Sequence, residues 1–265
     1  MARHRSRIED RRSRRSRGER EADGGDDRLI YGRRPVLEHL AAGAPAERLF
    51  VAQEASGGGN LAEILRRAAA GSLPTRRVPR SELDRLTDGG NHQGVAVLAS
   101  PFTYTELASL LSAPDATVLI LDGVMDPHNL GSLLRSVDGA GFGGVVIRSR
   151  RAVQVTASVR RVSAGAAEFV PVARVPNSTL AVERARDAGL WVVGLDGDAD
   201  EDLWSSSSLE PPVALVLGSE DRGIAPKVRD KCDELLRIPS RGRVGSLNVA
   251  VAGAIAMFEV ARRRG

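Results

Sequence analysis

The chain has few of the residues that several common kinds of site require. It contains one cysteine, Cys232, so no disulfide can form within it. Its four histidines are scattered rather than set at the spacing of metal ligands, and we therefore expect no metal site. No apolar run approaches the roughly 20 residues that a membrane helix needs, and the N-terminal region lacks the apolar core of a signal peptide. These absences predict a cytoplasmic protein that does not enter a membrane.

Lysine is also nearly absent, and arginine carries most of the positive charge. Residues 1–28 hold ten arginines and seven acidic residues, whereas the remaining chain, with 28 basic and 27 acidic residues, is almost neutral. Because the segment 1–28 lacks apolar periodicity, we expect a disordered tail. Its arginines suit an arm that binds nucleic acid, but a solvated tail enriched in arginine by coding bias explains them equally well.

The remaining chain is long enough for two domains, and 42% hydrophobic residues can form their cores. Residues 29–100 predict a small α/β domain, because helical and strand patterns alternate along them. The expected elements are a helix at 34–41, a strand at 48–52, a helix at 61–70, a strand at 76–78, a helix at 81–86 and a strand at 94–99. Ser100-Pro101-Phe102 then marks a boundary, and we interpret residues 101–115 as a linker with a leading helix.

Residues 116–265 continue the alternation on a larger scale. The pattern predicts strands at 117–121, 145–147 and 190–195, a strand that begins at 213 and a short strand that ends at Ile238-Pro239. It predicts helices at 130–140, 178–188 and after 248, and a helix that leads into a further strand within QVTASVRRVSAGAAEFVPV. A mostly parallel sheet with helices on both faces follows from this order. Two segments resemble ligand-binding loops, one for a dinucleotide and one for calcium, but neither fits its motif. The sequence GAGFGG follows a helix instead of joining a strand to one, and the acidic DGDADED lacks the glycine and glutamate of a calcium loop.

The stretch from Val213 to Val260 should organise the molecule, because two strand ends and one helix start meet in it. Ligands of open α/β sheets bind beyond the carboxyl ends of the strands. Gly218 would let a ligand approach the backbone, and Ser246 would cap the last helix. We expect the inner face of that helix to comprise Val249, Val251, Ile255, Met257 and Phe258.

Three segments of the sequence resemble the motifs of the SpoU/TrmH class of RNA 2′-O-methyltransferases. They are LDGVMDPHNLGSLLRS, LVLGSEDRGI and RIPSRGRVGSLNVAVA, in the order of the class. YGRRPVLEHL and NHQGVAV also resemble the RNA-binding domain that precedes the catalytic domain in this class, although His92 can equally be a loop residue that packs or caps. The resemblance covers residues 29–265. It implies a knotted, SPOUT-type trefoil in the C-terminal domain and a homodimer whose active sites use both subunits.

The resemblance also implies S-adenosylmethionine as the cofactor, held mainly by backbone and apolar contacts around Gly218, Ile238 and Leu247. It assigns the reaction to residues from all three motifs, namely Asn129, Arg135, Glu220, Ser246 and Asn248. Methyl transfer to a ribose hydroxyl needs an in-line approach and the loss of one proton, but no metal or covalent intermediate.

The role of Arg135 depends on the chemistry of guanidinium. In the related class this arginine has been discussed as the general base, but a guanidinium with a pKa above about 12 does not deprotonate readily. We expect Arg135 to grip a phosphate and polarise the 2′-oxygen. The proton would leave to water, to phosphate or to Glu220.

The target of the reaction is less sharply indicated than its type. The two-domain layout and the HQG segment look most like the subgroup that methylates a guanosine of 23S ribosomal RNA. Transfer RNA is the rival substrate, and a resistance-conferring enzyme that methylates another ribosomal nucleotide is a further alternative. A non-catalytic RNA-binding factor in ribosome assembly is a second class of function, but its expected signature, the loss of Asn129, Arg135 or Asn248, is missing.

Overall fold

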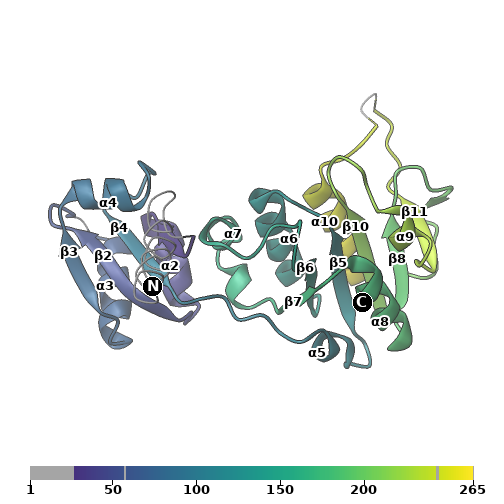
Figure 1. Ribbon diagram of the computed structural model, residues 1–265, viewed down its shortest axis with the longest axis horizontal. Coiled ribbons are helices and arrows are strands. Elements are labelled where there is room, and N and C mark those ends of the chain that lie inside the picture. The colour runs from purple at the N-terminus through teal and green to yellow at the C-terminus, as the bar shows by residue number, and fades with distance from the viewer. Residues whose placement is uncertain (1–26, 57, 243–244, 265) are drawn as a thin grey trace, which may run out of the picture.

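The computed structural model describes residues 27–56, 58–242 and 245–264. The predicted Arg-rich tail, 1–28, therefore lies outside the described residues except for Asp27 and Arg28. Figure 1 shows two α/β units joined by an extended linker, with the smaller unit formed by the N-terminal residues. Within the described residues, no helix is long and apolar enough to cross a membrane.

The smaller unit is a four-stranded sheet with helices. Its strands lie in the order β1-β4-β2-β3, and only the β2–β3 pair is parallel. The sequence pattern predicted all of its elements except the three-residue β1. The elements are β1 (Leu29–Tyr31), α2 (Arg33–Ala41), β2 (Ala46–Ala52), α3 (Asn60–Ala70), β3 (Thr75–Val78), α4 (Arg80–Leu86) and β4 (Val95–Ala99).

The larger unit follows the linker and contains seven strands. It begins with α5 (Leu107–Leu111), β5 (Thr117–Asp122), α6 (Pro127–Gly139), β6 (Gly144–Arg148), α7 (Ala157–Val162), the 3-10 helix η1 (Ala166–Glu168) and β7 (Val172–Val175). It continues with α8 (Ser178–Asp187), β8 (Trp191–Leu195), β9 (Glu201–Asp202), β10 (Val213–Gly218), α9 (Pro226–Arg229), β11 (Glu234–Arg237) and α10 (Val249–Arg263). The two-residue β9 is the one strand here that the pattern did not predict.

The seven strands lie in the order β7-β6-β5-β10-β8-β11-β9, and each described pair is parallel. Side chains of the interior strand β5 alternate between two apolar layers. Leu119 and Leu121 pack with residues of α6 and α10, whereas Val118 and Ile120 pack with residues of α5 and α8. The predicted α/β fold with helices on both faces of the sheet is therefore confirmed (Figure 1).

The start of α6 differs from the prediction. The helix begins at Pro127, three residues before the predicted start, because Asp126 accepts a hydrogen bond from the backbone of His128 and proline suits the first helical position. Asn129 therefore lies inside the helix and does not cap it.

The last helix, α10, also departs from the prediction in its cap and in its buried face. Asn248, rather than Ser246, caps it. Val251 and Phe258 are 48% and 51% exposed, so their assignment to the inner face was wrong. The helix instead turns Gly253 inward, where an added Cβ would lie 2.6 Å from side-chain atoms of Leu133 and Leu217. The helix therefore buries the face on which its backbone, at Gly253, lies close to the core side chains.

Candidate active site

The candidate site lies at the carboxyl edge of the larger sheet, where neighbouring parallel strands end together. Asp122 at the end of β5 is in register with Gly218 at the end of β10. A cavity of about 410 Å3 opens beside this edge. The strand ends, the loop before α10 and the first turn of that helix line it, through Leu195, Asp196, Gly197, Leu217, Gly218, Ser219, Glu220, Gly223, Leu236, Ile238, Ser240, Gly245, Ser246, Leu247, Asn248, Val249 and Ala252.

Residues from the three motifs form one hydrogen-bonded chain at this edge. Asn248 donates from Nδ2 to Oδ1 of Asn129 at 2.9 Å, and Asn129 donates from its own Nδ2 to Oε1 of Glu220 at 2.7 Å. The Oδ1 atom of Asn248 accepts from the backbone of Ala250 at 2.9 Å and of Val251 at 3.3 Å. This network fixes the orientation of both amides, because each oxygen accepts and each nitrogen donates.

The three side chains of this network differ in their exposure to solvent. Asn129 is 7% exposed, whereas Glu220 and Asn248 are exposed and line the cavity. The buried amide therefore connects two side chains that a bound molecule can reach. A buried polar group is stable only when it is hydrogen-bonded, and Asn129 satisfies this condition by using both ends of its amide.

Gly218 lines the cavity as expected, but glycine is required at this position for a different reason. An added Cβ would lie 1.9 Å from the carbonyl carbon of Gly223 and 2.1 Å from the backbone nitrogen of Ile224. The loop Ser219–Gly223 folds back on the strand end, and Ser219 and Gly223 pair through their backbones. Glycine at position 218 is therefore required by the loop that carries Glu220, and not primarily by a ligand.

Asp122 is a residue of this edge that the sequence reasoning missed. It is 5% exposed and accepts a 2.8 Å hydrogen bond from the backbone of Ala225. A second interaction, 3.7 Å long, joins it to Arg148 at the end of β6. Asp122 thereby holds the loop that follows β10. Its position directly after the apolar run of β5 was the one available signal.

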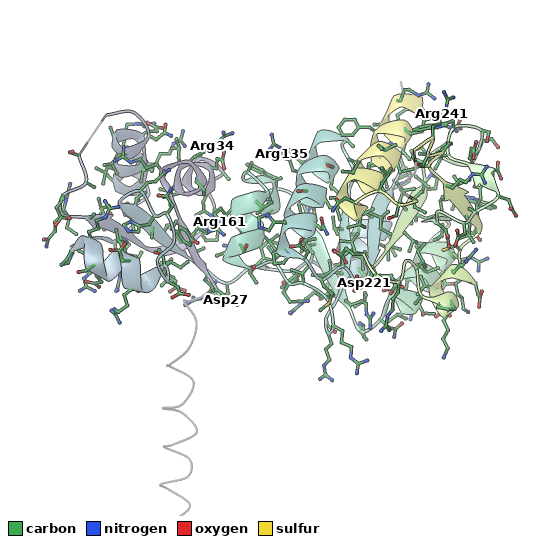
Figure 2. The ribbon with its side chains drawn as sticks, turned by 90° about the horizontal axis from the view of Figure 1, so that it is seen from above. Asp27, Arg34, Arg135, Arg161, Asp221 and Arg241 are labelled. Carbon is green, nitrogen blue, oxygen red and sulfur yellow. The ribbon has the colours of Figure 1, made fainter. Side chains whose placement is uncertain are left out.

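The structure brings together Glu220, Ser246 and Asn248 with Gly218, Ile238 and Leu247 around the cavity. It does not bring Arg135 there. Arg135 is exposed on α6 and does not line the cavity. Figure 2 shows its side chain pointing outward, on the side of the larger unit that faces the N-terminal one. Within the described residues, no group of three or more His, Cys, Asp or Glu side chains could hold a metal ion.

Two family models match the chain. Residues 116–258 match the SpoU rRNA Methylase family, and residues 29–105 match the RNA 2′-O ribose methyltransferase substrate binding domain. The chain belongs to the SpoU methylase family. The predicted relation to the SpoU/TrmH methyltransferases and the prediction of an RNA methyltransferase are confirmed.

Known relatives agree with this assignment along most of the chain. A putative TrmH family tRNA/rRNA methyltransferase of Staphylococcus haemolyticus is 38% identical over 244 residues, which cover 90% of this chain and 97% of that protein. An uncharacterized tRNA/rRNA methyltransferase of Mycobacterium ulcerans is 42% identical over 89% of this chain and 77% of its own length. Among solved structures, the SpoU methyltransferase AviRb from Streptomyces viridochromogenes in complex with the cofactor AdoMet is 28% identical with a TM-score of 0.73. That alignment covers 89% of this chain and 90% of AviRb.

Proposed function

We propose that the protein transfers the methyl group of S-adenosylmethionine to a ribose 2′-hydroxyl of RNA, and that its substrate is a guanosine of 23S ribosomal RNA. The hydrogen-bonded chain from Asn248 through Asn129 to Glu220, beside a cavity at the strand ends, carries this proposal. Such an enzyme would work in the cytoplasm.

The cavity fits the proposed cofactor in size and in chemistry. Its volume of about 410 Å3 lies within the range of about 300–1,000 Å3 that is usual for small-molecule sites. Apolar side chains such as Ile238 and Leu247 suit an adenine ring and a thioether, and the polar side chain of Asp196 suits a ribose or an amino group. Bound S-adenosylmethionine would supply a methyl group activated by the adjacent sulfonium.

The protein's own residues would orient the hydroxyl and receive its proton. Glu220 carries a carboxylate at the cavity, and Asn129 holds one of its oxygens in place. Asn248 couples this pair to the start of α10, so the carboxylate keeps its position relative to the cavity floor. Preorganised polar groups of this kind lower a reaction barrier because they need not reorient as charge develops. We assign Ser246 to contact with the nucleophile or cofactor from the same rim.

A homodimer is part of the proposal, because Arg135 does not line the cavity of its own chain. Arg135 and Gly139 lie one turn apart on the same face of α6. An added Cβ at Gly139 would lie 3.4 Å from the ring of Phe258, so Arg135 borders an exposed apolar stripe on α10. That stripe consists of Val251 and Phe258 on the helix, which are 48% and 51% exposed, and of Leu247 just before the helix, which is 45% exposed.

A second copy packed on this stripe would cover the apolar side chains and place Arg135 near the partner's cavity. The fork of a guanidinium would then bind the phosphate of the target nucleotide. We also propose the trefoil knot of the C-terminal domain, which the family membership supports.

Transfer RNA remains the alternative substrate, since the names of the relatives include both RNA classes. The NHQGVAV segment does not distinguish them by its contacts. His92 is 1% exposed, bonded to Asp84 at 2.9 Å and to the backbone of Gly94 at 3.0 Å, which makes it a packing residue of the small domain.

The deciding experiment compares RNA from a strain that lacks the gene with RNA from its parent. Mass spectrometry of nucleosides from purified 23S RNA and purified tRNA should show one 2′-O-methylguanosine missing from the 23S fraction alone. The purified protein, given S-adenosylmethionine, should restore it. A loss from tRNA alone would identify the alternative substrate, and unchanged RNA in both fractions would indicate a non-catalytic factor.

A further inference from the structure

A buried ionic cluster joins the two domains at a distance from the candidate active site. The carboxylate of Glu168, in η1, lies 3.1 Å from Nδ1 of His39 in α2 and 3.6 Å from Nε of Arg160 in α7. The side chains of the three residues are only 7%, 2% and 5% exposed, respectively. One member of the cluster therefore comes from the small domain and two come from the large one.

The partners in this cluster show that it forms when the domains meet. A buried carboxylate is costly unless cations pair with it, and Arg160 supplies one cation from the same domain. His39 supplies the second interaction from the other domain, and its Nδ1 must donate because a carboxylate only accepts. Its Nε2 is buried and has no hydrogen-bond partner in the described part of the chain. The hydrogen bond of the His39 ring is thus directed across the domain boundary.

Close contacts surround the cluster. Ala157 of α7 belongs to the same apolar cluster as Val36 and Ile30 of the small domain. Gly165 has a φ of +89°, and an added Cβ would lie only 3.7 Å from Cβ of Glu38. This loop can approach α2 closely because position 165 has no side chain. We call His39, Glu168 and Arg160, together with Ala157 and Gly165, the interdomain seam.

Basic side chains stand on both sides of the seam. Arg34 is exposed on α2, and Arg161 on α7 lies 4.5 Å from the ring of Tyr31. Figure 2 shows Arg34 and Arg135 pointing outward on the same side of the molecule, with Arg161 between the two domains. The orientation of the domains therefore sets the distance between basic groups of the small domain and the proposed phosphate-binding arginine.

We infer that the interdomain seam is a docking interface that fixes the register between RNA held by the small domain and the active site, with His39 and Glu168 as positioning residues. The inference rests on the proposed function for its catalytic consequence. Its structural part, the docking itself, does not.

The first test is the variant His39→Leu, which replaces the donor with an apolar side chain of similar size. Domain misplacement should lower kcat/KM for a structured RNA by about ten- to hundredfold, the size expected when distant groups misplace a substrate. The affinity for S-adenosylmethionine should stay within about twofold, because the seam lies outside the cavity, and small-angle scattering should show a larger radius of gyration. His39→Gln, which keeps an N–H donor, should retain most of the activity and the compact shape. Glu168→Gln provides an independent variant if His39→Leu does not fold.

A disulfide across the seam supplies the matched control. The separation of 3.7 Å between Cβ of Glu38 and an added Cβ at Gly165 suits a disulfide, for which about 3.8 Å is typical. The double variant Glu38→Cys/Gly165→Cys should oxidise readily, and the oxidised form should be active. Combined with His39→Leu, oxidation should restore turnover and compactness, and reduction should return both to the values of His39→Leu alone. The reduced form controls for strain at the left-handed position 165.

Cys232 can stay in place, because burial raises the pKa of its thiol to about 12 and keeps it unreactive.

The outcomes separate the inference from the proposed function. If the wild-type protein methylates no RNA, the proposed function fails, while scattering and disulfide formation still decide whether the domains dock. Unchanged scattering and turnover in His39→Leu would contradict the inference that the interdomain seam fixes the orientation of the domains. Thiols at positions 38 and 165 that stay reduced under oxidising conditions, or an oxidised form that does not rescue His39→Leu, would overturn it as well.

Discussion

The side-chain amide of Asn129 donates a 2.7 Å hydrogen bond to the carboxylate of Glu220, although 91 positions separate the two residues in the chain. The oxygen of the same amide accepts from Asn248 at 2.9 Å. Asn129 is therefore the central member of the network, because its amide is the group that joins Glu220 to Asn248.

Replacing Asn129 with alanine should lower the rate of methyl transfer by about 10²–10³-fold, as does the loss of one preorganised donor in other active sites. The affinity for S-adenosylmethionine should change by no more than about threefold, because Asn129 does not line the cavity. Single-turnover rates and calorimetry measure the two quantities. Asn177→Ala is the matched control: Asn177 caps α8 through a 2.9 Å bond to Leu180, so its loss should cost about 1 kcal/mol of stability and no activity. Equal rate losses in both variants would show a general effect of instability.

Arg135 tests whether a guanidinium binds phosphate or removes the proton. If it binds phosphate, Arg135→Lys keeps the charge but loses the planar fork, and turnover should fall while cofactor affinity is spared. Arg135→Ala should cost about 3–4 kcal/mol of transition-state stabilisation. The pH–rate profile of Arg135→Lys should be lower than that of the wild type but identical in shape. A controlling ionisation that disappears in the variant would establish the general-base role instead. Arg184→Ala, which removes an exposed arginine that pairs with Asp187, should leave the rate unchanged.

The sequence was sufficient for most of the fold because strands and helices alternate and leave strong apolar patterns. Leu119 and Leu121 face one helix layer and Val118 and Ile120 the other, which is the continuous apolar run expected of a strand buried on both faces. The missed strands β1 and β9 are only three and two residues long, too short to show a period.

Hydrophobicity alone did not identify the buried face of α10. The largest side chains of the helix were expected to point inward, yet Phe258 is half exposed while Gly253 contacts the core. Small residues allow the helix backbone to pack closely, and that preference depends on the neighbouring elements rather than on the helix itself.

The sequence also could not show which site residues touch each other. The motifs identified Asn129, Glu220 and Asn248, but their hydrogen bonds depend on three segments that meet only in the fold. Asp122 was missed because a single carboxylate after a strand has no distinctive spacing. The pairing of His39 with Glu168 involves residues 129 positions apart in two domains, and no periodic pattern connects them.

The exposed stripe on α10 predicts the oligomeric state. Phe258→Lys introduces a charge where the dimer would exclude water, so the variant should be a monomer by light scattering and should lose methyl transfer. Trp191→Lys is the matched control, because Trp191 is also half exposed, at 46%, but lies at the opposite, amino-terminal edge of the sheet. It should keep the mass and the activity of the wild type. A wild-type protein that is monomeric and fully active would show that Arg135 does not need a partner.

The C-terminal helix should carry a stability contribution that depends on acid pH. Glu259 is 7% exposed, and hydrogen bonds from Arg262 and Arg263 lower the pKa of its carboxyl group to about 2. Arg263 in turn donates to backbone oxygens of Leu203 and Ser206, so the carboxylate helps to fix the helix end to the loop after β9. A carboxyl whose pKa is lower in the folded than in the unfolded state stabilises the fold above the unfolded pKa of 4.5, and this contribution is lost as the pH falls from there toward 2.

Glu259→Gln should therefore lower the unfolding free energy of the larger domain by a constant amount between pH 5 and 7, and the difference from the wild type should shrink progressively below about pH 4.5. Urea unfolding followed by tryptophan fluorescence reports on this domain alone, because Trp191 and Trp204 are the only tryptophans. Glu63→Gln is the matched control. Arg66 and Arg67 lower the pKa of Glu63 to about 2 in the same helical arrangement, but Glu63 lies in the small domain and is more exposed, so the tryptophan transition should not move. A difference between Glu259→Gln and the wild type that stays constant down to pH 3 would show that the variant loses packing rather than a charged contact.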